Sequence, residues 1–132
     1  MSYGMAAALQ AALFARLSHL EALADWPVLD APPRGKGEAS FVLIGPEDVI
    51  DRSDKTGSGA EHRFTVSVIS DAAGFQAAKA AAVAISDALG EGVLALERGR
   101  MVGLWFQRAV ARRLDEGRQR RIDLTFRARV EG

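Results

Sequence analysis

The sequence predicts an α+β fold: a single antiparallel sheet of four to five strands with two helices packed on one face. Two segments carry apolar residues at spacings of three and four, which is typical of helices. Four others are continuously apolar or alternate between apolar and polar residues, as strands do. The order helix, strand, hairpin, helix, hairpin favours antiparallel neighbours, and 132 residues suffice for a single domain over 1–132.

The first helix is expected over residues 5–24 and ends before Pro27, which disfavours helical geometry in the residue before it. One stripe of leucines defines its buried face: Leu9, Leu13, Leu17 and Leu20. Residues 28–30 can then be extended, and residues 31–37, with two prolines and two glycines, form a surface connection.

The first hairpin is expected to pair residues 41–44, a continuous apolar run, with residues 61–69, which alternate cleanly. Gly45 and Pro46 break or bulge the first of these strands. Residues 51–59 contain no apolar side chain, so they form a solvated, flexible hairpin tip.

The second helix is expected over residues 72–89, with Asp71 as its N-cap and Gly90 as its stop. A short apolar stretch, 93–96, precedes the second hairpin. That hairpin joins residues 101–112 to 121–130 through a turn at 115–118, and the first of its strands alternates Val102, Leu104 and Phe106 with Gly103, Trp105 and Gln107.

With both helices on one face, the other sheet face stays uncovered and polar. It is expected to present Arg63, Thr65, Ser67, Trp105, Gln107, Arg127 and Arg129. A solvated face explains all of these except Trp105, because a monomer tends to cover a large aromatic ring. Trp105 is therefore either an interface anchor or a residue tucked under a hairpin loop.

No group of residues predicts catalysis, a cofactor or a metal. The chain has no cysteine, which excludes thiolate chemistry, disulfides and cysteine-based metal sites. His19 and His62 lack metal-ligand spacing, and no serine lies in a nucleophile motif. The glycines near Ser58 lack the spacing of a phosphate loop. We therefore expect a protein that is not an enzyme and needs no cofactor.

Charge is balanced overall but unevenly distributed. Residues 1–96 carry seven basic and twelve acidic residues, whereas residues 97–132 carry ten arginines and five acidic residues. This asymmetry is either uneven surface composition or a sign of head-to-tail contacts. The densest charge cluster is a group of arginines near the second hairpin. It is interpreted in one of three ways: as a solvated hairpin end, as a source of salt bridges to a partner, or as phosphate contacts of a nucleic-acid binder. It comprises Arg108, Arg112, Arg113, Arg118, Arg120 and Arg121.

The apolar stretch near the start is too short to span a membrane and lacks the basic leader of a signal peptide. We therefore expect no membrane contact and a cytoplasmic protein.

The arrangement resembles phage tail terminator (tail-completion) proteins, including those of phage-like gene transfer agents. The most informative match is residues 54–66, DKTGSGAEHRFTV, which resemble the loop and following strand of that family. Leu17 and Leu20, Pro32 and Pro33, the strand from Phe41, Ala78 and Lys79, and the segment from Phe106 to Ala128 continue the match over nearly the whole chain.

The resemblance implies a homohexameric ring that caps the head-proximal end of the tail tube and docks the neck, with DNA passing through its bore. Its partners would be further copies of itself, the tail tube protein and the head-neck stopper protein. The chain would then be found in the cytoplasm of the producing bacterium during assembly, and later in the tail and neck of the particle.

On this interpretation we assign Arg52, Asp54, Lys55 and Thr56 to contacts along the tail axis. Subunit contacts are assigned to Trp105, Arg112, Arg113 and Arg127. The alternatives are another neck component, such as the head-to-tail stopper, and a small ligand-binding accessory domain that uses the sheet face as a pocket.

Overall fold

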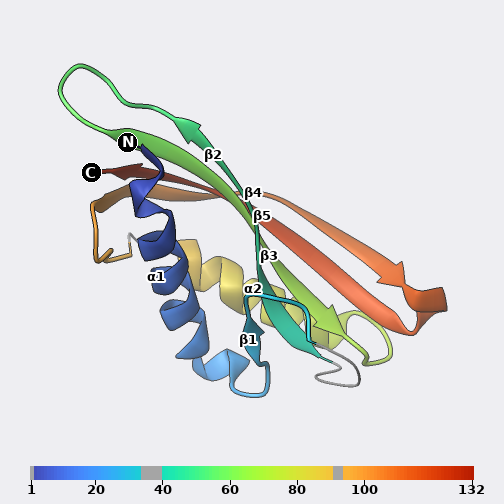
Figure 1. Cartoon of the computed structure of the whole chain (residues 1–132). Coiled ribbons are helices and arrows are strands. Elements are labelled where there is room, and N and C mark those ends of the chain that lie inside the picture. The colour runs from blue at the N-terminus through green and yellow to red at the C-terminus, as the bar shows by residue number, and fades with distance from the viewer. Residues whose placement is uncertain (1, 34–39, 91–93) are drawn as a thin grey trace.

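The computed structural model describes residues 2–33, 40–90 and 94–132, and it confirms the α+β fold. One open five-stranded sheet, in the order β1-β2-β3-β5-β4, has both helices on one face (Figure 1). The strands are β1 (Val28–Leu29), β2 (Phe41–Asp51), β3 (Gly59–Ser70), β4 (Arg100–Leu114) and β5 (Gln119–Glu131).

The first helix is shorter than the leucine stripe predicts. A 3-10 turn over Ser2–Met5 leads into α1 (Ala6–Ser18), and a second 3-10 turn, Glu21–Leu23, follows it. Leu20 is extended, with φ −74° and ψ 125°, so the predicted helix over 5–24 is interrupted there. The break turns the chain toward β1 while Leu23 remains buried in the core.

The second helix, α2 (Gln76–Gly90), begins later than predicted, and Asp71 is not its N-cap. The Asp71 carboxylate instead accepts a hydrogen bond of 2.9 Å from the Ser40 hydroxyl. Gly74, at φ +80°, holds a left-handed conformation that stops the helix from starting earlier. Gly90 is the last helical residue.

The sheet is mixed rather than wholly antiparallel. β1 pairs in parallel with β2, with Val28 opposite Val42, while the other pairs are antiparallel. The bulge predicted at Gly45 and Pro46 is present as a register shift between Ile44 and Glu47, with a cis peptide between the glycine and the proline. β2 continues past it to Asp51, so the first hairpin is longer than expected.

Strand β4 departs most from its predicted alternation, because it contains two bulges, at Met101/Gly103 and Phe106/Arg108. The second bulge adds one unpaired residue, so the residues after it face the side of the sheet opposite to the one that strict alternation predicts. Ala109 and Ala111 therefore lie opposite the buried Leu124 and Ile122, on the helix face of the sheet. The pattern also placed Gln107 on the open face, but it lies in the bulge and pairs with no β5 residue.

The core lies between the helices and the central strands β3 and β5. Phe64 and Phe126 stack with ring centroids 5.5 Å apart, and Phe106 meets Phe126 edge-on at 5.8 Å. Leucines of α1 and small residues of α2 cover this layer. Residues 94–96 form no strand, although Leu94 and Leu96 pack against the core; Val93, Arg34 and Lys36 lie outside the described residues.

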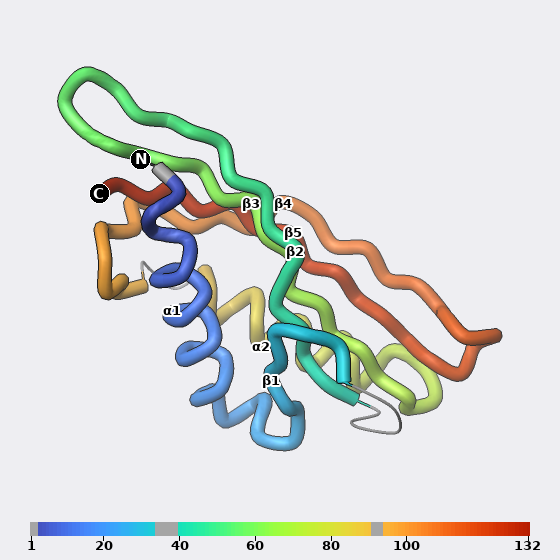
Figure 2. Tube along the Cα trace, viewed as in Figure 1, coloured from blue at the N-terminus to red at the C-terminus, as the bar shows by residue number. Residues whose placement is uncertain are grey.

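The two hairpins point to opposite ends of the sheet (Figure 2). The β2–β3 tip, residues 52–58, extends beyond the helices at the end of the sheet where both chain termini lie, while the β4–β5 turn, Asp115–Gly117, lies at the far end. The pairing of β3 with β5 shows the same arrangement, because Gly59, next to the tip, pairs with Glu131 near the C-terminus, whereas Ser70 pairs with Arg120 near the β4–β5 turn. No helix within the described residues is long and apolar enough to cross a lipid bilayer.

Candidate interaction surfaces

Four surfaces carry most of the polar clusters and exposed apolar side chains of the described residues: the open sheet face, the β2–β3 tip, a groove between α2 and β4, and the outer side of α1.

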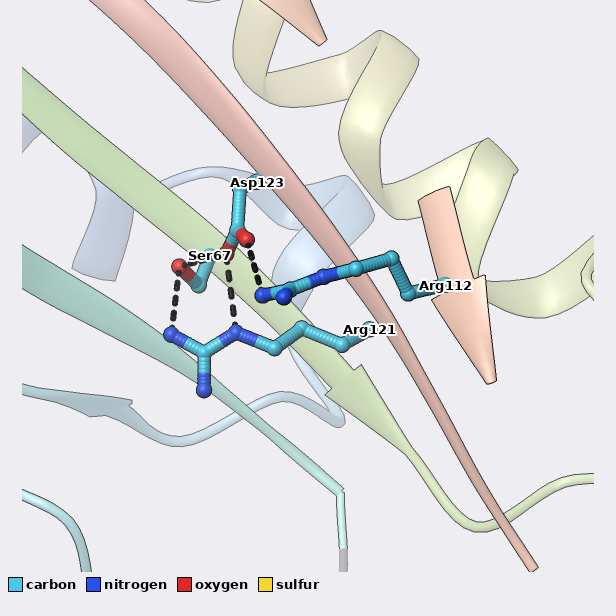
Figure 3. Close-up of polar contacts among 4 residues, drawn as sticks. All are labelled: Ser67, Arg112, Arg121 and Asp123. Carbon is cyan, nitrogen blue, oxygen red and sulfur yellow. Dashed lines mark hydrogen bonds and ion pairs between the residues drawn. The ribbon is translucent and has the colours of Figure 1, made fainter. Parts of the chain in front are cut away.

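One hydrogen-bonded network on the open face joins three strands around Asp123 of β5 (Figure 3). The Asp123 carboxylate accepts hydrogen bonds from Ser67 Oγ at 2.6 Å, Arg121 Nε at 2.8 Å and Arg112 Nη2 at 2.9 Å. Arg121 Nη2 also donates to Ser67 Oγ at 3.3 Å. Desolvation raises the pKa of Asp123, but the hydrogen bonds and the arginine charges together lower it below its ordinary value.

A second open-face network lies around Glu61 of β3, which is only 6% exposed. Arg127 Nη1 donates to Glu61 Oε1 at 3.1 Å, and Arg63 Nε lies 3.3 Å from Oε2. The hydrogen bond from Arg127 is the main reason that the pKa of Glu61 is lowered. The Arg127 guanidinium carbon also lies 4.5 Å from the centroid of the Trp105 ring, a cation–π contact that links β4 to this network.

Trp105 is not tucked under a hairpin loop. Its ring lies across Gly103 of the same strand, where an added Cβ would overlap the ring unless the ring moved. The ring remains 44% exposed, because the sheet face around it is uncovered. The assignment of Trp105 to a subunit contact stays a prediction.

The β2–β3 tip is organised by Asp54. Its carboxylate accepts hydrogen bonds from the backbone N–H and hydroxyl of Thr56, both at 2.8 Å, and from Gly57 N–H at 3.0 Å. These bonds, led by the Thr56 backbone, lower the pKa of Asp54. Arg129 Nη2 donates to the Arg52 carbonyl at 3.0 Å, so β5 supports the tip. The tip that the sequence predicts to be flexible therefore has internal hydrogen bonds of its own.

Cationic side chains surround Phe75, next to the start of α2. The Arg113, Arg120 and Lys79 cations lie 5.3, 5.8 and 5.8 Å from its ring centroid. We call these residues the Phe75 cluster. At the adjacent turn, Arg118 forms a 2.8 Å ion pair with Asp115, which lowers the pKa of that carboxyl group.

An apolar groove of 320 Å³ extends from this cluster between α2 and β4, on the helix face of the sheet. Val83 and Phe106, 57% and 51% exposed, leave much of their side chains in solvent. The groove, called the α2–β4 groove below, is lined by Lys79, Ala82, Val83, Ser86, Phe106, Ala109, Ala111, Ile122 and Leu124.

A second apolar patch lies on the outer side of α1. Phe14 is 44% exposed there and shares a shallow hollow with Ala7, Ala11, Gln10 and Asp30. Gln10 donates a long hydrogen bond of 3.4 Å to Asp30, which follows β1, so this α1 patch faces the β1 side of the sheet.

The structure separates the predicted site residues into three places. Arg52, Asp54, Lys55 and Thr56 lie at or beside the tip, Trp105 and Arg127 in the middle of the open face, and Arg112 and Arg113 near the far end of β4. Arg112 and Arg113 point to opposite faces, because they pair with Arg121 and Arg120. The sequence prediction missed Glu61, Phe75, Val83 and Phe14. Phe14 and Val83 were detectable as apolar residues off the buried stripes of their helices.

Groups of three or more His, Cys, Asp or Glu residues arranged to hold a metal ion are absent from residues 2–33, 40–90 and 94–132. The surfaces combine fixed charges, exposed aromatic rings and apolar hollows, which is typical of a protein that acts by binding and assembly.

The chain belongs to the family of tail completion protein gp17, whose family model matches residues 7–131. A solved structure titled "Virion of native gene transfer agent (GTA) particle" contains a chain with 57% sequence identity and a TM-score of 0.91. The match covers 99% of this chain and 100% of that chain. No curated protein matches. The chain is thus a tail completion protein, a structural component of a virion tail.

Proposed function

We propose that this chain forms a homohexameric ring that closes the head-proximal end of a tail tube in a gene-transfer-agent particle. The observation that carries the proposal is the 57% identity to a chain of a native gene transfer agent virion, over nearly the full length of both chains. Function resides in surfaces, and DNA passes through the bore without being read. Assembly takes place in the cytoplasm of the producing bacterium, and the finished ring stays between tail and neck.

The ring has two kinds of contact. The β2–β3 tip, with Arg52, Asp54, Lys55 and Thr56, makes the contacts along the tail axis, toward the tail tube protein or the head-neck stopper protein. Its extension beyond the helices supports this role (Figure 1). Trp105, Arg112, Arg113 and Arg127 contribute to contacts between subunits, because they present cations and an exposed aromatic ring on β4 and β5.

The ring is tested by light scattering of the purified chain over a concentration series, alone and with the tail tube protein. A closed six-subunit species, alone or on the tube, is expected. A monomer or dimer that ignores the tube contradicts the proposal.

The axial role is tested by replacing Ser53–Ser58 with the two-residue turn Asn-Gly, which can close the hairpin between Arg52 and Gly59. These residues already face each other, since Arg52 N–H donates to the Gly59 carbonyl at 2.8 Å. We expect a nearly unchanged thermal midpoint and tails that fail to join heads. Normal particle yield from the shortened hairpin contradicts the axial role.

A further inference from the structure

We propose that the α2–β4 groove of one subunit receives the α1 patch of a second copy of this chain, with Phe14 as the inserted side chain. The inference rests on the proposed ring and names a pair of surfaces that join its subunits in addition to the β4 and β5 residues assigned above.

Both surfaces are apolar and exposed, and each lacks a partner within the described part of the chain. The groove leaves Val83 and Phe106 more than half exposed. Phe14 projects from a helical face that is otherwise small, because Ala7 and Ala11 flank it. An aromatic side chain set among alanines can enter a hollow of 320 Å³ without moving the helix. Because Phe14 is 44% exposed, docking removes from water somewhat less than half of the roughly 150–250 Å² that a whole aromatic side chain can bury.

Charge selects the second copy as the occupant. Residues 100–121, which include β4, carry seven arginines and two acidic residues. Residues 2–33 and 40–51, which include α1, β1 and β2, carry six acidic residues and one arginine. The two edges of one sheet are therefore oppositely charged, and the basic edge of one copy attracts the acidic edge of another.

The charges also set the direction of the docked helix. The Phe75 cluster places Lys79, Arg113 and Arg120 at the end of the groove where α2 begins. Exposed acids, Glu21 and Asp25, follow the end of α1. An α1 that lies antiparallel to the neighbour's α2 brings these acids to the cluster while Phe14 reaches Val83 and Phe106.

A symmetric pairing is disfavoured by the same charges. Groove against groove would bring two Phe75 clusters together, and two α1 patches would bring acid against acid. The unlike pairing leaves one free groove and one free α1 patch on every dimer, so each copy can bind two neighbours, as a ring requires.

Cross-linking tests this contact directly, because the chain has no cysteine of its own. Phe14→Cys is combined with Val83→Cys, and the matched control combines Phe14→Cys with Ala77→Cys, an exposed α2 position that does not line the groove. Particles carrying each variant are treated with a short bis-maleimide. We expect a ladder of covalent multimers from the first pair and monomers from the control. No ladder, or equal ladders, overturns the inference.

Mixing distinguishes this contact from other modes of assembly. Phe14→Glu destroys only the α1 patch, and Val83→Glu destroys only the groove. Each variant alone should lose self-association at least tenfold, on the chain or on the tail tube, and their mixture should form a heterodimer and nothing larger. If each variant still assembles like wild type, the contact is wrong while the ring stands. If particles that lack the chain altogether complete their tails normally, the proposed function is wrong as well.

Discussion

The open face and the α2–β4 groove are both exposed surfaces on the same sheet, but their side chains differ in how far they are paired within the chain. On the open face, Glu61 and Asp123 have arginine partners within the chain. In the groove, Val83 and Phe106 are each more than half exposed, although Phe106 packs edge-on against Phe126. The carboxylates of the first surface are held by ion pairs within the chain, which stabilise the monomer, although Trp105 on the same face stays exposed. The apolar side chains of the second surface have no such role in the monomer and are available to another molecule. Substitutions in the groove should therefore change assembly without changing the stability of the monomer.

The largest effect on the monomer is expected from Arg127→Ala, because it leaves the buried Glu61 carboxylate without its shorter ion pair and uncovers Trp105. We expect a loss of about 3 kcal/mol in the free energy of unfolding, measured with urea. Arg108→Ala, at an exposed β4 position, is the control, with a change within about 0.5 kcal/mol. Equal losses in the two variants would show that the Glu61 network does not stabilise the fold.

A smaller loss is expected from Asp123→Ala, which removes the acceptor for Ser67, Arg112 and Arg121 (Figure 3). Arg112 and Arg121 remain partly solvated, so the loss is about 2 kcal/mol. Asp87→Ala, at an exposed position of α2, is the control and should change the free energy of unfolding in urea very little. If Asp123→Ala left the free energy of unfolding unchanged, the arginines would have found equally good partners elsewhere.

Acid should weaken the two carboxylate networks of the open face. The pKa values of Glu61 and Asp123 are lowered, so their stabilisation is complete above the ordinary carboxyl pKa of about 4 and is lost as pH falls through the lowered values. Unfolding free energy measured from about pH 6 to about pH 2 should therefore decline. Glu61→Gln should reduce the slope, and an unchanged slope would exclude this carboxyl group as a source of the decline.

The smallest effect on the monomer is expected from Val83→Glu in the groove. The side chain is more than half exposed, so the free energy of unfolding should change by less than about 0.5 kcal/mol, although self-association is lost. Ala77→Glu adds the same charge to α2 outside the groove and controls for it. A monomer unfolded by Val83→Glu would mean that the groove belongs to the core.

The sequence predicted the fold class and both hairpins because alternation and helical spacing are local signals that survive in the packed structure. The prediction was wrong where contacts between residues distant in sequence determine the local structure. The Asp71 carboxylate accepts a hydrogen bond from Ser40 and does not cap the helix. The bulge after Phe106 moves Ala109 and Ala111 from the open face, where the alternation would place them, to the helix face. For the candidate sites, the pattern placed Trp105 and Arg127 on the same open face. It did not pair Arg127 with Glu61, because 66 residues separate them and only strand register brings them together.

Strand β4, with its two bulges and its arginines, is the last strand at one edge of the sheet. A flat edge of fifteen residues would be a template for indiscriminate β-pairing between chains, and hence for aggregation. The bulges interrupt its regular backbone hydrogen-bonding pattern, and Arg108, Arg112 and Arg113 repel a second strand of the same kind. We therefore expect newly made copies to resist strand-to-strand aggregation at this edge, which leaves contacts between side chains to join them.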